Sequence, residues 1–208
     1  MSPTKQKIIA AAIGLYNEKG VPAVTMRDIA QSVGISAGNL AYHFKNQDFI
    51  IEEAFRQMEA QRDDILSGVQ EIPSFENINA QLVPLLKLAR TYSFIYLDSV
   101  HIFRTYPGIA RLQRSYFEQS IAYIKAVIEL SQGAGNIIPE PRTGTYQRLA
   151  HTTWMIINFW LEQAILRGEN DARDDDIRQK IWDLVIPYLT DKGHHQFAKL
   201  YKPENASA

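Results

Sequence analysis

The chain has 208 residues, of which 46% are hydrophobic, and its 22 basic and 23 acidic residues give a formal net charge of −1. This composition is typical of a globular protein with a sizeable core, and no uncharged apolar run is long enough to predict a membrane-spanning helix. Cysteine is absent, which excludes disulfide bonds, thiol catalysis and cysteine-based zinc sites. Because the N-terminus also lacks the pattern of a signal peptide, we expect a cytoplasmic protein that does not bind membranes.

The charge is distributed unevenly along the chain. Residues 1–47 contain five basic and only two acidic side chains, a net charge of +3. Because the whole chain carries −1, the remaining residues carry −4. A small basic segment beside a mildly acidic body is typical of a protein in which one part meets a polyanion and the other does not.

Hydrophobic residues recur at helical spacing along nearly the whole chain, and the two-residue alternation of β-strands is missing, so an all-α fold is predicted. The predicted helices cover approximately residues 4–19, 26–32, 36–44, 46–69, 80–89, 92–105, 109–132, 145–167 and 175–190. The helix over 92–105 is apolar on nearly all sides and is expected to be buried. Pro187 is expected to bend the last predicted helix.

Turn and cap residues define the first three helices. Gly20 ends the first helix. Thr25 and Asp28 have the spacing of a capping box at the start of the second helix. Gly34 supplies the turn to the third helix, which Ser36 caps. Two short helices joined by a tight turn, with another helix packed in front, form a helix-turn-helix unit that binds DNA.

The third helix has features suited to the major groove of duplex DNA. It opens with small side chains, which let its N-terminus approach the bases closely. Its later polar side chains are hydrogen-bond donors suited to phosphate oxygens. The candidate DNA-binding residues on this unit are Thr25, Arg27, Ser36, Ala37, Gly38, Asn39, Tyr42, His43 and Lys45.

These segments together resemble the N-terminal domain of the TetR family of transcriptional regulators. The similarity is collinear from about residue 5 to residue 50, and its pieces are residues 7–12, 18–20, 25–30, 33–36 and 38–46. The resemblance implies an N-terminal three-helix DNA-binding domain and a larger C-terminal helical domain that dimerises and binds an effector. It also implies a homodimer that grips palindromic operator DNA, commonly as a repressor.

Two positions depart from the pattern of the family. Ala41 stands where the family usually has an aromatic residue, and Gln47 stands where it usually has lysine. Both departures put some contacts with the DNA backbone in doubt. Among the residues present, asparagine suits adenine and arginine suits guanine or phosphate, so Asn39 and Arg27 are expected to read bases. The alternative for Arg27 is an ion pair with Asp28 or exposure to solvent.

The C-terminal part contains polar residues embedded in apolar helices. They are candidates for lining a pocket that takes a largely apolar small molecule with a few polar anchors. The candidate pocket residues are Tyr96, Asp98, His101, Tyr116, Tyr123, Trp154 and Asn158. Alternatively, these groups satisfy one another in the core, or those on the helix near residue 154 lie in a dimer seam.

The predicted organisation is a DNA-binding domain over 1–47, an effector-binding and dimerisation domain over 48–202, and a disordered tail over 203–208. The helices at 146–166 and 177–189 have apolar stripes and are expected to form the dimer interface as a four-helix bundle. No motif predicts catalysis, a metal site or a cofactor, so an enzyme is disfavoured. Regulation by a protein partner, or action as an activator, stays open as an alternative.

Overall fold

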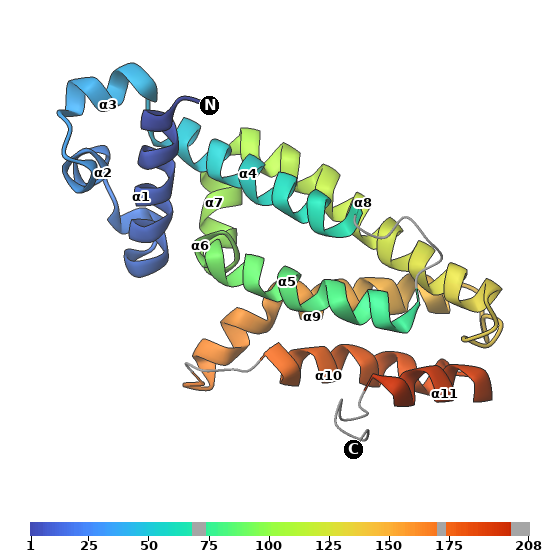
Figure 1. Ribbon diagram of the computed structural model, residues 1–208. Helices are drawn as coiled ribbons and strands as arrows, with labels where there is room; N and C mark the ends of the chain where they lie inside the picture. Colours follow the sequence, from blue (N-terminus) through green and yellow to red (C-terminus); the bar gives the residue numbers. More distant parts are fainter. Residues whose placement is uncertain (68–73, 170–173, 201–208) are drawn as a thin grey trace. The chain divides into compact units, whose positions relative to one another are not determined.

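The computed structural model describes residues 1–67, 74–169 and 174–200 of the chain. The predicted all-α fold is confirmed, since the described residues contain helices, turns and one isolated β-bridge between Ile137 and Leu189. The helices are α1 (Pro3–Lys19), η1 (Val21–Ala23), α2 (Met26–Val33), α3 (Ala37–His43), α4 (Gln47–Ser67), α5 (Phe75–Thr91), α6 (Ser93–Leu97), α7 (Ser99–Thr105), α8 (Pro107–Gly133), α9 (Thr145–Leu166), α10 (Asp174–Val185), η2 (Ile186–Tyr188) and α11 (Asp191–Lys199). Figure 1 labels the α-helices. None of the described helices has the length and apolar character to cross a membrane.

The chain packs into two compact units. Unit 1 comprises residues 1–64 and 88–115, and unit 2 comprises residues 65–87 and the chain from 116 onward. The unit boundaries fall inside α4, α5 and α8. These boundaries differ from the predicted domain boundary at residue 47. That boundary separates predicted functions and stays a prediction. The predicted tail over 203–208 lies outside the described residues.

The caps predicted for the first three helices are confirmed. The Thr25 side chain accepts from the Asp28 backbone N–H, and the Asp28 carboxylate accepts in return from the Thr25 backbone N–H. Gly34 ends α2 in the left-handed conformation, at φ 73°, where a side chain would be strained. The Ser36 side chain accepts from the backbone N–H of Asn39 at the start of α3.

Aliphatic and aromatic side chains form the small core between α1, α2 and α3. Helix α1 contributes Ile8, Ile9, Ala12 and Tyr16, each at most 1% exposed. Helices α2 and α3 contribute Ile29, Ala30, Val33 and Leu40. Phe44, just after α3, is buried as well. Burial of these residues fixes which side of α3 faces outward, because residues three and four apart share a helix face.

The prediction of one buried helix over residues 92–105 is wrong. Two short helices, α6 and α7, meet at Asp98, whose backbone has φ −99° and ψ 16°. Nor is the segment buried throughout, since Val100 is 62% exposed and Arg104 is exposed. A local reading of apolar residues misses the kink because the Asp98 carboxylate bonds to Val21, which is 77 residues away.

Unit 2 is built around an aromatic and aliphatic core. Phe75, Trp182 and Tyr146 are each at most 3% exposed, and the rings of Phe75 and Trp182 lie 5.0 Å apart in an edge-on arrangement. The predicted last helix ends earlier than expected, because η2 replaces its final turn around Pro187. A further helix, α11, follows, and it is absent from the helices predicted from the sequence.

Candidate nucleic-acid interface

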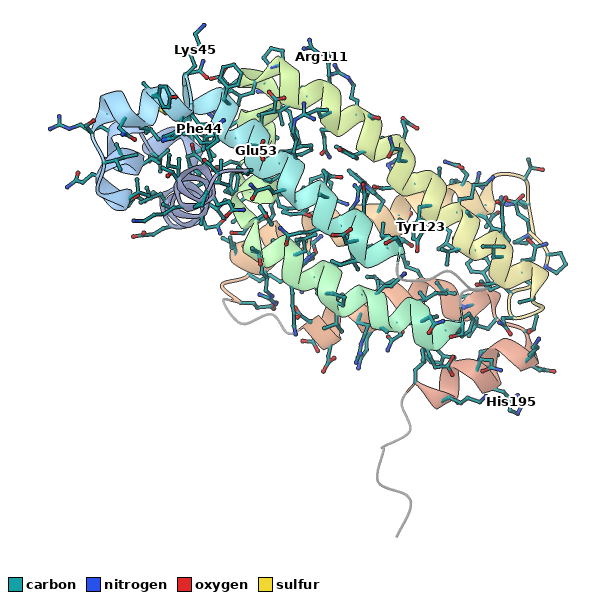
Figure 2. All side chains as sticks on the ribbon, turned by 45° about the horizontal axis from the view of Figure 1, so that its top comes forward. Phe44, Lys45, Glu53, Arg111, Tyr123 and His195 are labelled. Carbon is teal, nitrogen blue, oxygen red and sulfur yellow. The ribbon has the colours of Figure 1, made fainter. Side chains whose placement is uncertain are left out.

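The outer side of α3 carries small and hydrogen-bonding side chains. Leu40 is fully buried and anchors the helix, whereas Tyr42 is 86% exposed. The His43 ring is half-buried and meets the Tyr42 ring edge-on, with 5.3 Å between the centroids. The other candidates on and beside α3 are all exposed, namely Ser36, Ala37, Gly38, Asn39 and Lys45. Figure 2 shows Lys45 extending away from the ribbon.

Arg27 and Thr25 lie at the start of α2. Both are exposed. The Asp28 carboxylate accepts from the Thr25 hydroxyl at 2.6 Å and from the Thr25 backbone N–H at 2.9 Å. These two hydrogen bonds lower the pKa of Asp28. The Asp28 carboxylate is therefore held by Thr25 at the helix cap, and the exposed Arg27 guanidinium can reach outward.

Gly38 sits near the N-terminus of α3. A Cβ atom at this position would have the Ser36 Oγ as its nearest neighbour, at 4.0 Å. The fold of the chain would therefore accommodate a larger residue at position 38. Small size at Gly38 suits close approach of another molecule, such as the edge of a DNA groove.

The two departures from the family pattern have different surroundings. Ala41 is exposed on α3 and adds no polar group to this surface. The Gln47 side chain donates a hydrogen bond to the Val21 carbonyl at 3.3 Å. Gln47 therefore holds η1 to the start of α4 from inside unit 1, where a lysine in the family pattern would supply a charge.

Asn17 on α1 holds the start of α6. Its Nδ2 donates to the Thr91 carbonyl at 2.8 Å. Its Oδ1 accepts from the Ser93 hydroxyl and from the Phe94 backbone N–H, each at 3.0 Å. One side chain from α1 thus satisfies three polar groups around the α5–α6 junction.

Asp98 makes a second link of this kind. Its carboxylate accepts from the Val21 backbone N–H at 2.7 Å. A Cβ atom on the neighbouring Gly20 would lie 3.3 Å from that carboxylate, and Gly20 has φ +77°. Glycine therefore provides both the backbone conformation and the space for Asp98 to reach η1. The sequence predicts Asp98 in a ligand pocket, a role that stays a prediction, and it gives no local signal for Asn17.

A buried ion pair lies deeper in unit 1. Glu59 on α4 is 3% exposed, and its carboxylate lies 2.5 Å from the Arg62 guanidinium. Burial raises the pKa of Glu59 to about 7, while the Arg62 charge acts to lower it. Burial also raises the pKa of Tyr96, and the charges of Glu59 and Arg62 both act on this hydroxyl. Of the predicted pocket residues, Tyr96 thus adjoins two charged groups that the prediction did not include.

The remaining predicted pocket residues have other neighbours. In unit 1, the half-buried His101 meets the Tyr106 ring edge-on at 6.3 Å between centroids. In unit 2, the Tyr123 hydroxyl donates to Gln81 at 3.2 Å. Trp154 packs edge-on against Phe117 at 4.6 Å between centroids.

The seven candidates divide between the two units. Asn158 donates to the Trp154 carbonyl within α9, and Tyr116 is half-buried on α8. Tyr96, Asp98 and His101 belong to unit 1, and the other four belong to unit 2. Their shared role as a ligand pocket stays a prediction.

Comparisons with known proteins agree with this arrangement. The family model described as "Bacterial regulatory proteins, tetR family" matches residues 8–54. A second model, described as "TetR: Bacterial transcriptional repressor", matches residues 52–197.

Individual relatives point the same way. The transcriptional repressor KstR2 of Mycolicibacterium smegmatis is 36% identical over 179 residues, covering 79% of this chain and 83% of that protein. The negative transcriptional regulator IcaR of Staphylococcus aureus is 44% identical over 52 residues, 25% of this chain and 28% of that protein. The crystal structure of a TetR-family regulator from Marinobacter aquaeolei superposes with a TM-score of 0.85 at 25% identity, covering 97% of this chain and 100% of that one.

Proposed function

The chain belongs to the TetR family of bacterial transcriptional regulators, and we propose that it is a ligand-responsive repressor that binds a palindromic operator as a homodimer. The observation that carries the proposal is the outward side of α3, where small and hydrogen-bonding residues cover a helix anchored by the buried Leu40. A short helix with this surface fits the major groove, which is about 12 Å wide.

The proposal is tested by binding to duplex DNA. We expect the purified protein to bind the promoter region upstream of its own gene at moderate salt, and to protect two half-sites related by a two-fold axis. Affinity should fall as salt concentration rises, because the basic side chains displace counterions from phosphate. Equal affinity for unrelated DNA under the same conditions would contradict the proposal.

Single substitutions refine the assignment of base contacts. Asn39→Ala and Arg27→Ala should each cost about 1–3 kcal/mol of operator binding and relax the preference at one operator position. Gln31→Ala, which removes an exposed polar side chain from α2, is the matched control and should bind like the parent. Both test variants binding as tightly and as selectively as the parent would reject these two contacts.

The proposed homodimer uses the exposed stripe of α9. Met155, Phe159 and Leu166 are 47%, 37% and 86% exposed, and their spacing of four and seven residues puts them on one side of the helix. Exposed apolar residues gathered on one face suit a protein interface.

The mass of the protein in solution tests the dimer. Phe159→Asp puts a charge in the middle of the stripe and should convert the dimer into a monomer, with loss of operator binding. Leu130→Asp, which changes an apolar residue of α8 that is 50% exposed, should stay dimeric. A parent protein that is monomeric at micromolar concentration would contradict the proposal.

The proposed effector is a small, largely apolar molecule that binds near Tyr96 and releases the operator. The Glu59–Arg62 pair beside Tyr96 supplies polar anchors in an otherwise buried setting. Asn17 and Asp98 join α6 and α7 to α1 and η1, so a ligand that moves α6 would act on the DNA-binding helices. A compound that raises the melting temperature of the parent, releases it from DNA and loses both effects in Tyr96→Ala would support this site.

A further inference from the structure

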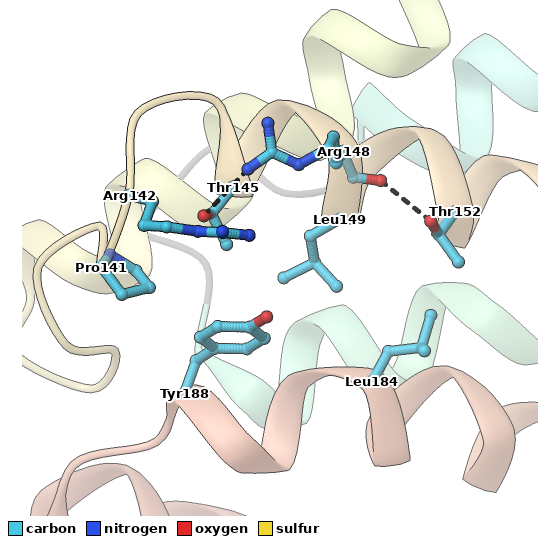
Figure 3. Close-up of a pocket in the computed structure, with 8 residues that line it drawn as sticks. All are labelled: Pro141, Arg142, Thr145, Arg148, Leu149, Thr152, Leu184 and Tyr188. Carbon is cyan, nitrogen blue, oxygen red and sulfur yellow. Dashed lines mark hydrogen bonds between the residues drawn. The ribbon is translucent and has the colours of Figure 1, made fainter.

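Unit 2 contains a pocket of about 330 Å³ between α9, the loop before it, the end of α10 and η2. Figure 3 shows eight residues that line it. Its volume is at the small end of the range of ligand sites in proteins. The pocket is built within one unit of one chain and shares no residue with the proposed DNA-binding surface. Five of its lining residues lie on the two helices predicted to form the dimer interface, namely Arg148, Leu149, Thr152, Leu184 and Tyr188.

Arginine side chains give the pocket its charge. Arg142 comes from the loop before α9, and Figure 3 shows its side chain extending into the space between Thr145 and Tyr188. Arg148 lies above the first turn of α9, where its guanidinium donates to the Thr145 hydroxyl at 3.2 Å. None of the eight lining residues is acidic. Both arginines are exposed, so two positive charges border this space without a carboxylate among the lining residues.

The local backbone holds Arg148 in place. Gly144 caps α9 with φ +81°, and a Cβ atom there would lie 2.8 Å from the Arg148 Nη1. Glycine thus leaves room for the guanidinium over the helix N-terminus. The nearby Glu140 carboxylate accepts from the Tyr146 backbone N–H at 2.9 Å, so this acid is already engaged as a helix cap.

Hydrogen-bond donors remain available inside the pocket. Across the described residues, neither the Arg142 guanidinium nor the Tyr188 hydroxyl has a hydrogen-bond partner. Figure 3 shows the Tyr188 hydroxyl on the pocket side of its ring. A guanidinium and a phenol hydroxyl that face one space can donate together to the oxygens of an anion.

The opposite wall of the pocket is apolar. Leu149 is buried and Leu184 is half-buried, and both line the same space as Arg142. A molecule that fits must therefore combine an anionic group with an apolar portion. We infer that this pocket binds a small organic anion, a carboxylate with a short apolar chain, whose oxygens accept from Arg142 and Tyr188 and whose chain rests on Leu149 and Leu184.

The experiment follows the methyl NMR signals of Leu149 and Leu184 in the full chain during titration with hexanoate. Hexanamide, which has the same chain without the charge, and inorganic phosphate, which has charge without a chain, are titrated in parallel. Hexanoate should shift both leucine signals in a saturable way, and hexanamide should not. Phosphate should bind more weakly than hexanoate, because it makes no contact with the leucine wall.

Substitutions separate the pocket from general attraction to a basic surface. Arg142→Gln should weaken hexanoate binding by about tenfold or more, because it removes a charge-assisted hydrogen bond. Arg111→Gln, a change at an exposed arginine of α8 outside the pocket, should leave the titration unchanged. An unaltered melting temperature shows that Arg142→Gln still folds, since the Arg142 side chain holds no other group in place.

Three results would overturn the inference. The first is a titration without saturation, and the second is an equal response to hexanoate and hexanamide. The third is a shift of the leucine NMR signals that depends on the protein concentration and does not change when hexanoate is added. That third result would mean that a carboxylate of a second copy of the chain fills the pocket.

Discussion

The two units keep their helices together by different kinds of side chain. In unit 1, Asn17, Gln47 and Asp98 reach backbone groups far away in the sequence, and a buried carboxylate lies beside Arg62. In unit 2, aromatic residues of the core itself make two of the polar links. The Tyr146 hydroxyl donates to the Ile138 carbonyl at 2.5 Å, and the Trp182 indole donates to Asn79 at 3.0 Å.

This difference extends to the surfaces of the two units. Unit 1 presents small and hydrogen-bonding residues on α3, a chemistry suited to bases and phosphates. Unit 2 presents methionine, phenylalanine and leucine on α9, a chemistry suited to another protein surface. The arrangement of helices in unit 1 thus depends on a few polar side chains, each of which a single substitution can remove. The arrangement in unit 2 depends more on the shape and close packing of its residues. Substitutions in each unit test this contrast.

The largest expected effect comes from the close packing of unit 2. A Cβ atom on Gly193 of α11 would lie 2.0 Å from the Asn136 carbonyl oxygen, so Gly193→Ala should lower the free energy of unfolding by about 3–4 kcal/mol. Gly133→Ala is the matched control, because a Cβ there meets no atom within 4 Å and alanine favours a helix. Urea denaturation measures both, and a similar stability of the two variants would break the contrast.

The next effect tests the polar interior of unit 1. Because burial raises the pKa of Glu59 from 4.5 to about 7, the folded chain binds this proton more tightly than the unfolded chain. Stability from this group is therefore fully present below pH 4.5 and is lost as the pH rises through 7, a change of about 3 kcal/mol. Glu59→Gln should remove that slope from the pH dependence of the unfolding free energy.

Asp63→Asn provides the control for this pH dependence. Asp63 also contacts Arg62, at 3.0 Å, but its side chain is 62% exposed. The slope should thus persist in Asp63→Asn when unfolding is followed by circular dichroism from pH 4 to 8. A slope that survives Glu59→Gln would place its origin elsewhere in the chain.

Local chemistry explains what the sequence predicted well. The caps at Thr25 and Ser36 and the turn at Gly34 depend on residues within three positions of each other, so a single segment contains the whole signal. The same holds for the outward residues of α3, because the helical period alone separates Leu40 from Asn39 and Tyr42. The DNA-binding surface could therefore be proposed before its structure was known.

Long-range contacts explain what the sequence did not predict. The kink at Asp98 depends on a hydrogen bond to Val21, and Asn17 accepts a hydrogen bond from Phe94, which the fold places beside it. Neither hydrogen bond can be predicted from the residues next to its partners in the sequence. Glu59 is different, since it falls in the apolar stripe of α4 with Phe55 and Met58. A charge at a core position, with Arg62 three residues later, was a signal that could have been used.

A smaller effect is expected from the link between α1 and α6. Asn17→Ala removes the hydrogen bonds to the Thr91 carbonyl and the Phe94 N–H and should cost about 2 kcal/mol of stability. Asn17→Asp keeps the acceptor for Ser93 and Phe94 but sets a charged oxygen opposite the Thr91 carbonyl oxygen, so it should also destabilise unit 1. If both variants unfolded at the same urea concentration as the parent, unit 1 would not depend on this polar link.

The smallest change in stability is expected at Gly38, where the effects on folding and on DNA binding should have opposite signs. Because a Cβ there has no neighbour closer than 4.0 Å, Gly38→Ala should fold normally and gain up to about 1 kcal/mol from the higher helix propensity of alanine. The added methyl group should nonetheless weaken operator binding, since it stands on the surface proposed to approach the bases. Urea denaturation and operator titration on the same preparation separate the two effects. A variant that gains stability and keeps full operator affinity would mean that the N-terminus of α3 does not approach DNA as closely as we propose.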